Sequence, residues 1–226
     1  FYFIYVIIKK YLKYIHRKMK SEKLKEGKAT RLANLQIDLW AEQITAISLF
    51  YKTEFPELSG INWKNVKLPI YTDERPRLEY IHSGIRGCND VVRRYHEKFG
   101  NLAQNDYSRD PDMAIHSKQE RSSTAYPFAW AGTIEPDNEH LNKSYNMFKD
   151  DGNTYMIPIE GLIAAYRYRC ETGEMLDIKG VTFFHATGSE GHVLGMCRNG
   201  NEGLNIGVEK PRSRDDNKGP RQVNIC

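Results

Sequence analysis

Residues 179–209, KGVTFFHATGSEGHVLGMCRNGNEGLNIGVE, contain the clearest strand pattern of the chain. An apolar stretch at residues 181–185 follows a glycine, and two more apolar runs, at residues 192–198 and 204–209, enclose a turn rich in glycine and asparagine. Alternating apolar residues on both sides of such a turn are typical of an antiparallel β-hairpin. We therefore expect three strands here, the last two paired around Gly200.

The register of this hairpin decides which side chains lie beside His192. With residues 200 and 201 at the centre of the turn, His192 pairs with Glu209, and alternation places Asn205 on the same face. A carboxylate or amide beside an imidazole fixes its tautomer and orientation, which a general base requires. The pattern thus indicates either a catalytic histidine or a surface histidine at the start of a strand.

Helical patterns dominate the first half of the chain. Apolar residues at helical spacing predict a helix over residues 29–54, and a second helical zone is expected over residues 77–99. Residues 57–75 have the composition of a loop, with a possible short strand at residues 66–71. Residues 100–123 are polar and rich in turn-forming residues, which indicates a long loop.

From residue 124 onward, strand patterns prevail. Residues 126–130 and 155–159 alternate as half-buried strands do, whereas residues 161–169 fit a helix or a strand equally well. A turn is expected at residues 171–174. Together with the hairpin, these patterns predict an α+β fold, with N-terminal helices followed by an antiparallel sheet that ends in a C-terminal β-hairpin.

Charge divides the chain into three parts. Residues 1–28 carry nine lysines and arginines against two glutamates, a net charge of +7, which leaves 4 − 7 = −3 for the rest. We therefore assign residues 1–28 to a basic N-terminal arm, residues 29–210 to a single α+β domain and residues 211–226 to a polar tail that we expect to be disordered. An arm of this charge suits contact with nucleic acid or a membrane surface, but lysines interrupt its apolar run before it could span a bilayer.

Cys88 is the best candidate for a nucleophile. A thiol is activated at a helix N-terminus, where the backbone N–H groups and the dipole stabilise the thiolate. Gly87 precedes Cys88, and Asn89 and Asp90 have the character of capping residues. The alternative is a core residue, because Cys88 lies on an apolar stripe with other helix residues. No CxxC pair occurs, and we expect neither a metal site nor a cofactor.

Residues 176–206 resemble the C-terminal half of the NlpC/P60 and CHAP papain-like cysteine hydrolases. The resemblance is carried by Gly180 before an apolar strand, by Gly191-His192-Val193 at a strand start, by Asn199-Gly200 in a turn, and by Asn205. It implies His192 as the general base and Asn205 as the residue that orients it. Val181 replaces the aspartate of the family, and Asn205 falls one position late.

The nucleophile half of that family aligns in two ways. Cys88 lies 92 residues before Gly180, which requires a large insertion relative to the family. An alignment through residues 126–133 instead places the cysteine position near Glu139 or His140, where no thiol occurs. That second alignment implies a papain-like fold without an active site.

Two functions from different classes follow. The favoured one is a structural or interaction protein of a larger assembly, which binds protein partners or a second copy through its basic arm and its aromatic-rich sheet domain. The alternative is a papain-like cysteine hydrolase that cuts amide bonds in peptide or cell-wall material. In that case Cys88 attacks the carbonyl, His192 transfers the proton, and Asn205 or Glu209 orients the imidazole.

Overall fold

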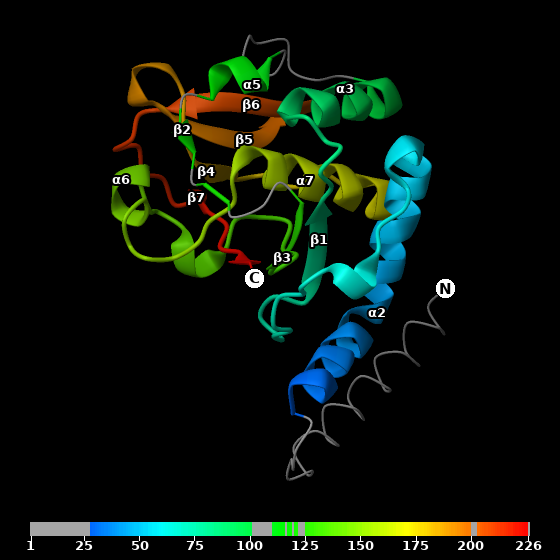
Figure 1. The fold of residues 1–226 in the computed structure, drawn as a ribbon. Coiled ribbons are helices and arrows are strands. Elements are labelled where there is room, and N and C mark those ends of the chain that lie inside the picture. Colours follow the sequence, from blue (N-terminus) through cyan, green and yellow to red (C-terminus); the bar gives the residue numbers. More distant parts are fainter. Residues whose placement is uncertain are drawn as a thin grey trace. The chain divides into compact units, whose positions relative to one another are not determined.

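The computed structural model confirms the α+β class, with helices preceding most of the strands (Figure 1). It describes residues 28–100, 110–115, 117–118, 120–121, 125–199 and 203–225. The basic arm predicted at residues 1–28 therefore lies almost wholly outside the described residues. The chain divides into two compact units, residues 1–42 and residues 43–226. The sheets and the candidate sites belong to the second unit.

Helix α2 spans Lys28–Glu54 and confirms the helix predicted at residues 29–54. Two short 3-10 helices follow it, η1 at Pro56–Leu58 and η2 at Trp63–Asn65. The possible strand at residues 66–71 does not form, because that described stretch pairs with no other strand. The only bridge recorded nearby joins Thr72 to Arg75, so this part of the chain is the loop that its composition indicates.

The prediction of a helical zone at residues 77–99 is wrong for its first half. Residues Arg77–Ile81 form strand β1, which pairs antiparallel with β3. This strand contains a charged residue, Glu79, that is only 1% exposed. Its carboxylate can be buried because cationic side chains form ion pairs with it. A charge inside an apolar strand breaks the alternation by which strands are recognised, and this explains the error.

The second half of that zone is helix α3, Cys88–Phe99, as predicted. Its N-terminus is capped from a distance, because the Asp112 carboxylate accepts the N–H groups of Cys88 at 2.8 Å and Asn89 at 2.9 Å. Asp112 belongs to the short helix α5, Pro111–Ala114. A Cβ on Gly87 would come within 2.4 Å of this carboxylate, so glycine is what allows its close approach.

Strand β3, Tyr126–Trp130, is the middle strand of a three-stranded sheet with the order β1-β3-β8. All five of its residues are buried. The strand itself was predicted correctly, but the prediction that only one of its faces would be buried was wrong. Since side chains alternate between the faces of a sheet, burial of both sets means that both faces are covered.

Helix α7, Pro158–Thr172, replaces the strand expected at residues 155–159 and settles the ambiguity at residues 161–169. Pro158 occupies the first helical position, where no N–H is needed, and Glu160 accepts the N–H of Ile157 at 2.9 Å. The helix is buried on nearly every side, so no apolar stripe marks it. The turn expected after it is formed by Gly173, whose φ of 78° ends the helix.

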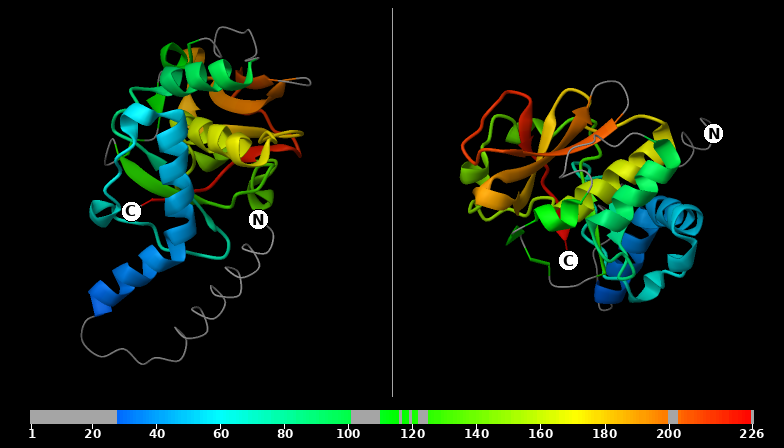
Figure 2. Two further views of the ribbon diagram at one scale, coloured as in Figure 1. Left: turned by 90° about the vertical axis from the view of Figure 1, so that its right-hand side faces the viewer. Right: turned by 90° about the horizontal axis from the view of Figure 1, so that it is seen from above.

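Helix α7 lies at the centre of the second unit (Figures 1 and 2). It contacts α3, strand β1 of the smaller sheet, and strands β4 and β5 of the larger sheet. The contact with β4 is very close, because a Cβ on Gly161 would lie 2.3 Å from the ring of Phe184. Glycine at this position therefore lets the helix approach the sheet.

The larger sheet has five strands, ordered β2-β4-β5-β6, with β7 also paired to β4. Its strands are β2 at Ser117–Lys118, β4 at Val181–Thr187, β5 at Val193–Asn199, β6 at Gly203–Glu209 and β7 at Lys218–Pro220. Antiparallel pairing of β5 with β6 confirms the predicted hairpin. The short elements η3 (Asn138–His140), α6 (Tyr145–Phe148) and η4 (Ser189–Gly191) connect the larger ones.

The prediction of a disordered tail at residues 211–226 is wrong. Strand β7 pairs parallel with β4, and β8, Asn224–Ile225, pairs with β3 of the other sheet. Between them, the guanidinium of Arg221 is fully buried and donates to Asp177 at 2.7 Å and to Thr182 at 2.8 Å. The polar residues of this segment satisfy buried groups, so its composition gave a false indication of disorder.

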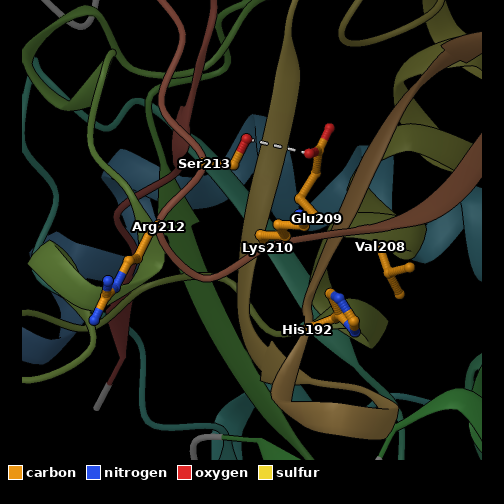
Figure 3. Close-up of a pocket in the computed structure, with 6 residues that line it drawn as sticks. All are labelled: His192, Val208, Glu209, Lys210, Arg212 and Ser213. Atoms are coloured by element: carbon orange, nitrogen blue, oxygen red, sulfur yellow. Dashed lines mark hydrogen bonds between the residues drawn. The ribbon is translucent and has the colours of Figure 1, made fainter.

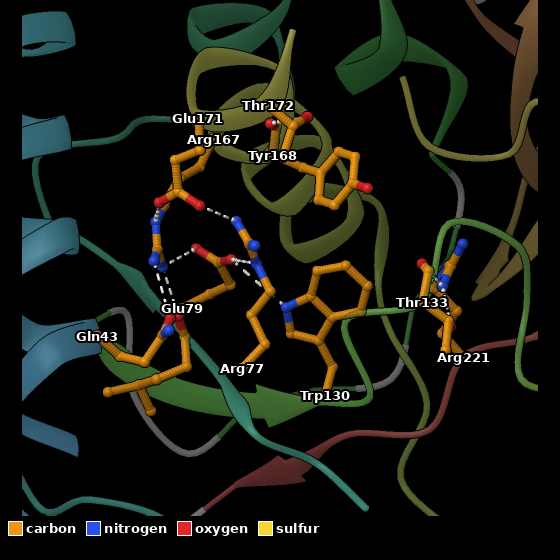
Figure 4. A network of polar contacts seen from close by, with 11 residues as sticks. Gln43, Arg77, Glu79, Trp130, Thr133, Arg167, Tyr168, Glu171, Thr172 and Arg221 are labelled. Carbon is orange, nitrogen blue, oxygen red and sulfur yellow. Dashed lines mark hydrogen bonds and ion pairs between the residues drawn. The ribbon is translucent and has the colours of Figure 1, made fainter. Parts of the chain in front are cut away.

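A second buried charge network joins α7 to the smaller sheet (Figure 4). The Arg167 guanidinium donates to the Leu78 carbonyl at 2.5 Å, to Glu79 at 2.9 Å and to Glu171 at 2.6 Å. Arg77 contacts the same two carboxylates. Arg167 and Glu79 are each 1% exposed, so if either side chain were removed, water could not solvate the charge of the other.

We expect Arg167→Ala to reduce the free energy of unfolding by about 3–5 kcal/mol, because it leaves the Glu79 carboxylate buried without its main partner. Chemical denaturation measures the change. Arg93→Ala is the matched control, because Arg93 pairs with Glu97 at an exposed site, with side chains 56% and 57% exposed. That pair should contribute less than about 1 kcal/mol. Equal losses in the two variants would contradict a structural role for the network.

An aromatic cluster surrounds His185 on strand β4. Its ring lies 5.9–6.4 Å, centroid to centroid, from the rings of Tyr145, Phe148 and Tyr155. Its Nδ1 is buried and has no hydrogen-bond partner among the described residues. Burial lowers the pKa of His185, the charge of Arg121 lowers it further, and Asp150 and Asp151 oppose the shift. The folded chain therefore favours the neutral imidazole.

This environment predicts acid sensitivity. The unfolded histidine has a pKa of about 6.5, so as the pH falls through this value the unfolded state binds the proton first and stability is lost. We expect His185→Phe to match the parent chain near pH 8 and to lose less stability near pH 5.5. Denaturation midpoints at the two pH values measure this. A pH dependence unchanged by the substitution would show that other groups cause it.

Candidate functional site: a basic hollow beside His192

The sequence-predicted histidine lies at an open hollow of about 510 Å³ (Figure 3). We call it the basic hollow. It is lined by His192, Val208, Glu209, Lys210, Arg212 and Ser213. These residues come from the start of β5, the end of β6 and the turn that follows β6, where two ends of the hairpin meet. Arg212 and Ser213 lie in the segment predicted to be a disordered tail, and Lys210 immediately precedes it, so the sequence did not indicate that they lie beside His192.

Glu209 is already neutralised within the basic hollow. Its carboxylate accepts the Lys218 ammonium at 2.7 Å and the Ser213 hydroxyl at 3.2 Å. Lys210 and Arg212 are exposed and form no ion pair with any described carboxylate. The surface charge that remains for a ligand is therefore positive.

His192 is held by its backbone. Its carbonyl accepts the N–H of Gly188 at 2.7 Å, and its side chain is 28% exposed. The Glu190 carboxylate approaches the ring, with its Oε2 4.0 Å from Nδ1. Figure 3 shows Ser213 and Glu209 facing each other and Arg212 pointing away from His192. This open arrangement suits contact with an anionic surface more than enclosure of a small substrate.

Two of the predicted site residues meet here and two do not. His192 and Glu209 line the same hollow, although Glu209 pairs with Val193 and not with His192. The turn is one residue longer than expected, so Asn205 pairs with Cys197 and its amide lies 3.6 Å from that thiol. Cys197, which lies opposite Asn205, is five residues after His192. Each residue of a strand spans about 3.3 Å, so Asn205 is roughly 16 Å from His192 along the strand.

Cys88 is not among the residues that line the basic hollow. It is 2% exposed, and burial raises the pKa of its thiol, with the Asp112 carboxylate raising it further. The favourable helix N-terminus is thus occupied by an internal anion. These are the properties expected of the core alternative, and the role of nucleophile stays a prediction.

No protein-family model, curated protein or solved structure matches the chain. Among the described residues, no three histidine, cysteine or acidic side chains are grouped closely enough to hold a metal ion. The described helices include none with the length and apolar character needed to cross a bilayer. The residues themselves are therefore the basis for any functional assignment.

Thiol labelling tests Cys88 directly. In a variant that keeps only this cysteine, we expect a thiol probe to react slowly near pH 7 until denaturant opens the fold, because the neutral thiol is buried. Asp112→Ala should accelerate labelling, since it removes both the cap and a negative charge. Rapid labelling of the folded chain that His192→Ala abolishes would instead support the hydrolase.

Proposed function

We propose that the chain is an interaction protein of a larger assembly, and that it contacts an acidic protein partner through its basic arm and its basic hollow. The observation that carries this proposal is the charge of the hollow. Glu209 is neutralised internally, whereas Lys210 and Arg212 extend into solvent. Exposed cations beside an internally paired carboxylate attract an anionic surface without a large desolvation cost.

We propose that the aromatic-rich sheet domain contacts its partner through the charged side chains of the basic hollow and not through its aromatic rings. The aromatic rings of the strands are buried in the core, notably Phe128, Trp130, Phe183 and Phe184. They stabilise the fold and are not available to a partner. We therefore assign the contact to the basic hollow and retain the arm, whose charge of +7 follows from residues 1–28 alone.

The distribution of charge favours an acidic protein over nucleic acid. Outside the arm, the net charge is −3. A nucleic acid binds through many adjacent phosphates and needs an extended positive surface, which a net charge of −3 outside the arm does not favour, whereas protein carboxylates can pair with a few exposed cations. The hydrolase alternative receives no comparable support, because Cys88 is buried and does not line the hollow beside His192.

Binding to labelled poly-L-glutamate tests this proposal with the full chain. We expect binding at low ionic strength that weakens as salt approaches about 200 mM, because screening shortens the range of exposed charges. The double variant Lys210→Glu and Arg212→Glu should bind severalfold more weakly than the parent chain. The same measurement with single-stranded DNA and anionic vesicles shows which class of polyanion is preferred.

The matched control reverses two exposed lysines away from the hollow, Lys52→Glu and Lys64→Glu. It changes the net charge by the same amount and should retain most of the binding. Equal losses in both double variants would show that only net charge matters. No binding to poly-L-glutamate at low salt, or a preference for DNA or vesicles, would contradict an acidic protein partner.

A further inference from the structure

A second hollow lies between η1, the loop that follows β1, and the first turns of α3. Its volume is about 500 Å³, and we call it the arginine hollow. Three guanidinium groups line it, those of Arg86, Arg93 and Arg94, together with the hydroxyl-bearing Ser83. The apolar part of its wall comes from Phe55, Leu58 and Ile85.

Arg94 has a fixed structural position. Its guanidinium donates to the Glu54 carbonyl at 2.6 Å and to the Glu57 carboxylate, and it lies 4.5 Å from the centroid of the Phe55 ring. These contacts hold it against the end of α2 and η1. Arg94 is therefore preorganised, and its charge and that of Glu57 offset each other, so the positive charge open to a ligand comes from Arg86 and Arg93.

The other two arginines have weaker internal partners. Arg93 pairs with Glu97 one turn along α3, where both side chains are more than half exposed. Such pairs contribute little, so the guanidinium can turn to a ligand at small cost. Arg86 is exposed and forms no ion pair with a described carboxylate. The nearby Asp90 accepts the backbone N–H of Arg86 at 2.9 Å.

The loop that carries Ser83 and Arg86 is held in place. Gly84 donates its N–H to Nδ1 of His82 at 2.9 Å, and Ile85 donates to the His82 carbonyl at 2.9 Å. A Cβ on Gly84 would lie 2.3 Å from the Leu58 side chain, so glycine lets the loop pack against η1. The hollow is therefore built before any ligand arrives.

From this arrangement we propose that the arginine hollow binds a small phosphate monoester. Guanidinium groups form paired, charge-assisted hydrogen bonds with phosphate oxygens, and two weakly partnered arginines match the two charges of a monoester. The apolar wall accommodates the organic body, and the volume lies within the range of small-molecule sites. Asp90, which also lines the hollow, disfavours a chain of phosphodiesters, which would place further negative charges beside its carboxylate. The backbone N–H groups of α3 take no part, because Asp112 occupies them.

This site is independent of the basic hollow, and its test differs accordingly. Chemical shifts of the Gly84 and Arg86 amides are followed by NMR while the full chain is titrated with phenyl phosphate, inorganic phosphate or a thymidine dinucleotide. We expect phenyl phosphate to bind most tightly and the dinucleotide least. Binding should weaken from about pH 7.5 to about pH 5.5, because the monoester loses its second charge near pH 6.

Variants separate the site from general charge. Arg86→Gln and Arg93→Gln should each weaken phenyl phosphate binding about tenfold, as expected for loss of a charge-assisted pair. Lys64→Gln removes one exposed charge elsewhere and should leave the affinity unchanged. Equal affinity in all three variants, tighter binding of the dinucleotide, or no binding of phenyl phosphate would overturn the proposal. Inorganic phosphate binding as tightly as phenyl phosphate would refute recognition of a monoester. None of these outcomes affects the poly-L-glutamate experiment.

Discussion

The buried ion pairs of helix α7 set the arrangement of the second unit. Near its N-terminus, Glu160 has no exposed surface and binds Arg121 and the Tyr126 hydroxyl. Near its C-terminus, Arg167 binds Glu79 of strand β1. A buried charge is stable only when its partner has the correct geometry, so each pair limits how α7 can slide or rotate against the smaller sheet. Apolar packing alone would restrict these movements less, because it has no direction.

These pairs also explain where sequence patterns succeeded and failed. The helices at residues 29–54 and 88–99 and the hairpin were predictable, since local periodicity and turn residues mark them. Most of helix α7 was left open between helix and strand, because burial on nearly all sides removes the apolar stripe that marks a helix. Strand β1 was misassigned because a buried charge interrupts its apolar pattern. The C-terminal segment was misassigned for the same reason, since Arg221 is polar by composition and fully buried in the fold.

The candidate sites were only partly predictable. The position of His192 at the start of a strand followed from the sequence, and so did the presence of Glu209 near it. The polar members Lys210, Arg212 and Ser213 come from the segment after β6, and only the fold brings them to His192. Asn205 was misplaced because a turn longer by one residue shifts every pair of the hairpin. The arginine hollow was not predictable, because the sequence around Arg93 and Arg94 is typical of a solvent-exposed helix face. Arg86 and Ser83 come near them only because the loop after β1 folds back toward α3.

The placement of β7 and β8 in different sheets has a consequence for biosynthesis. Each of these strands is short, yet each adds an edge to a sheet whose other strands precede it in the chain, and Arg221 between them fills a buried polar site with Asp177 and Thr182. The larger sheet is incomplete until residue 220 has left the ribosome, and the smaller sheet until residue 225 has done so. Until then, the edges of β3 and β4 and the carboxylate of Asp177 lack their partners, and the nascent chain is open to strand pairing with its neighbours on the same messenger. Folding of this domain therefore depends on its last segment, in which a few polar residues form the required contacts.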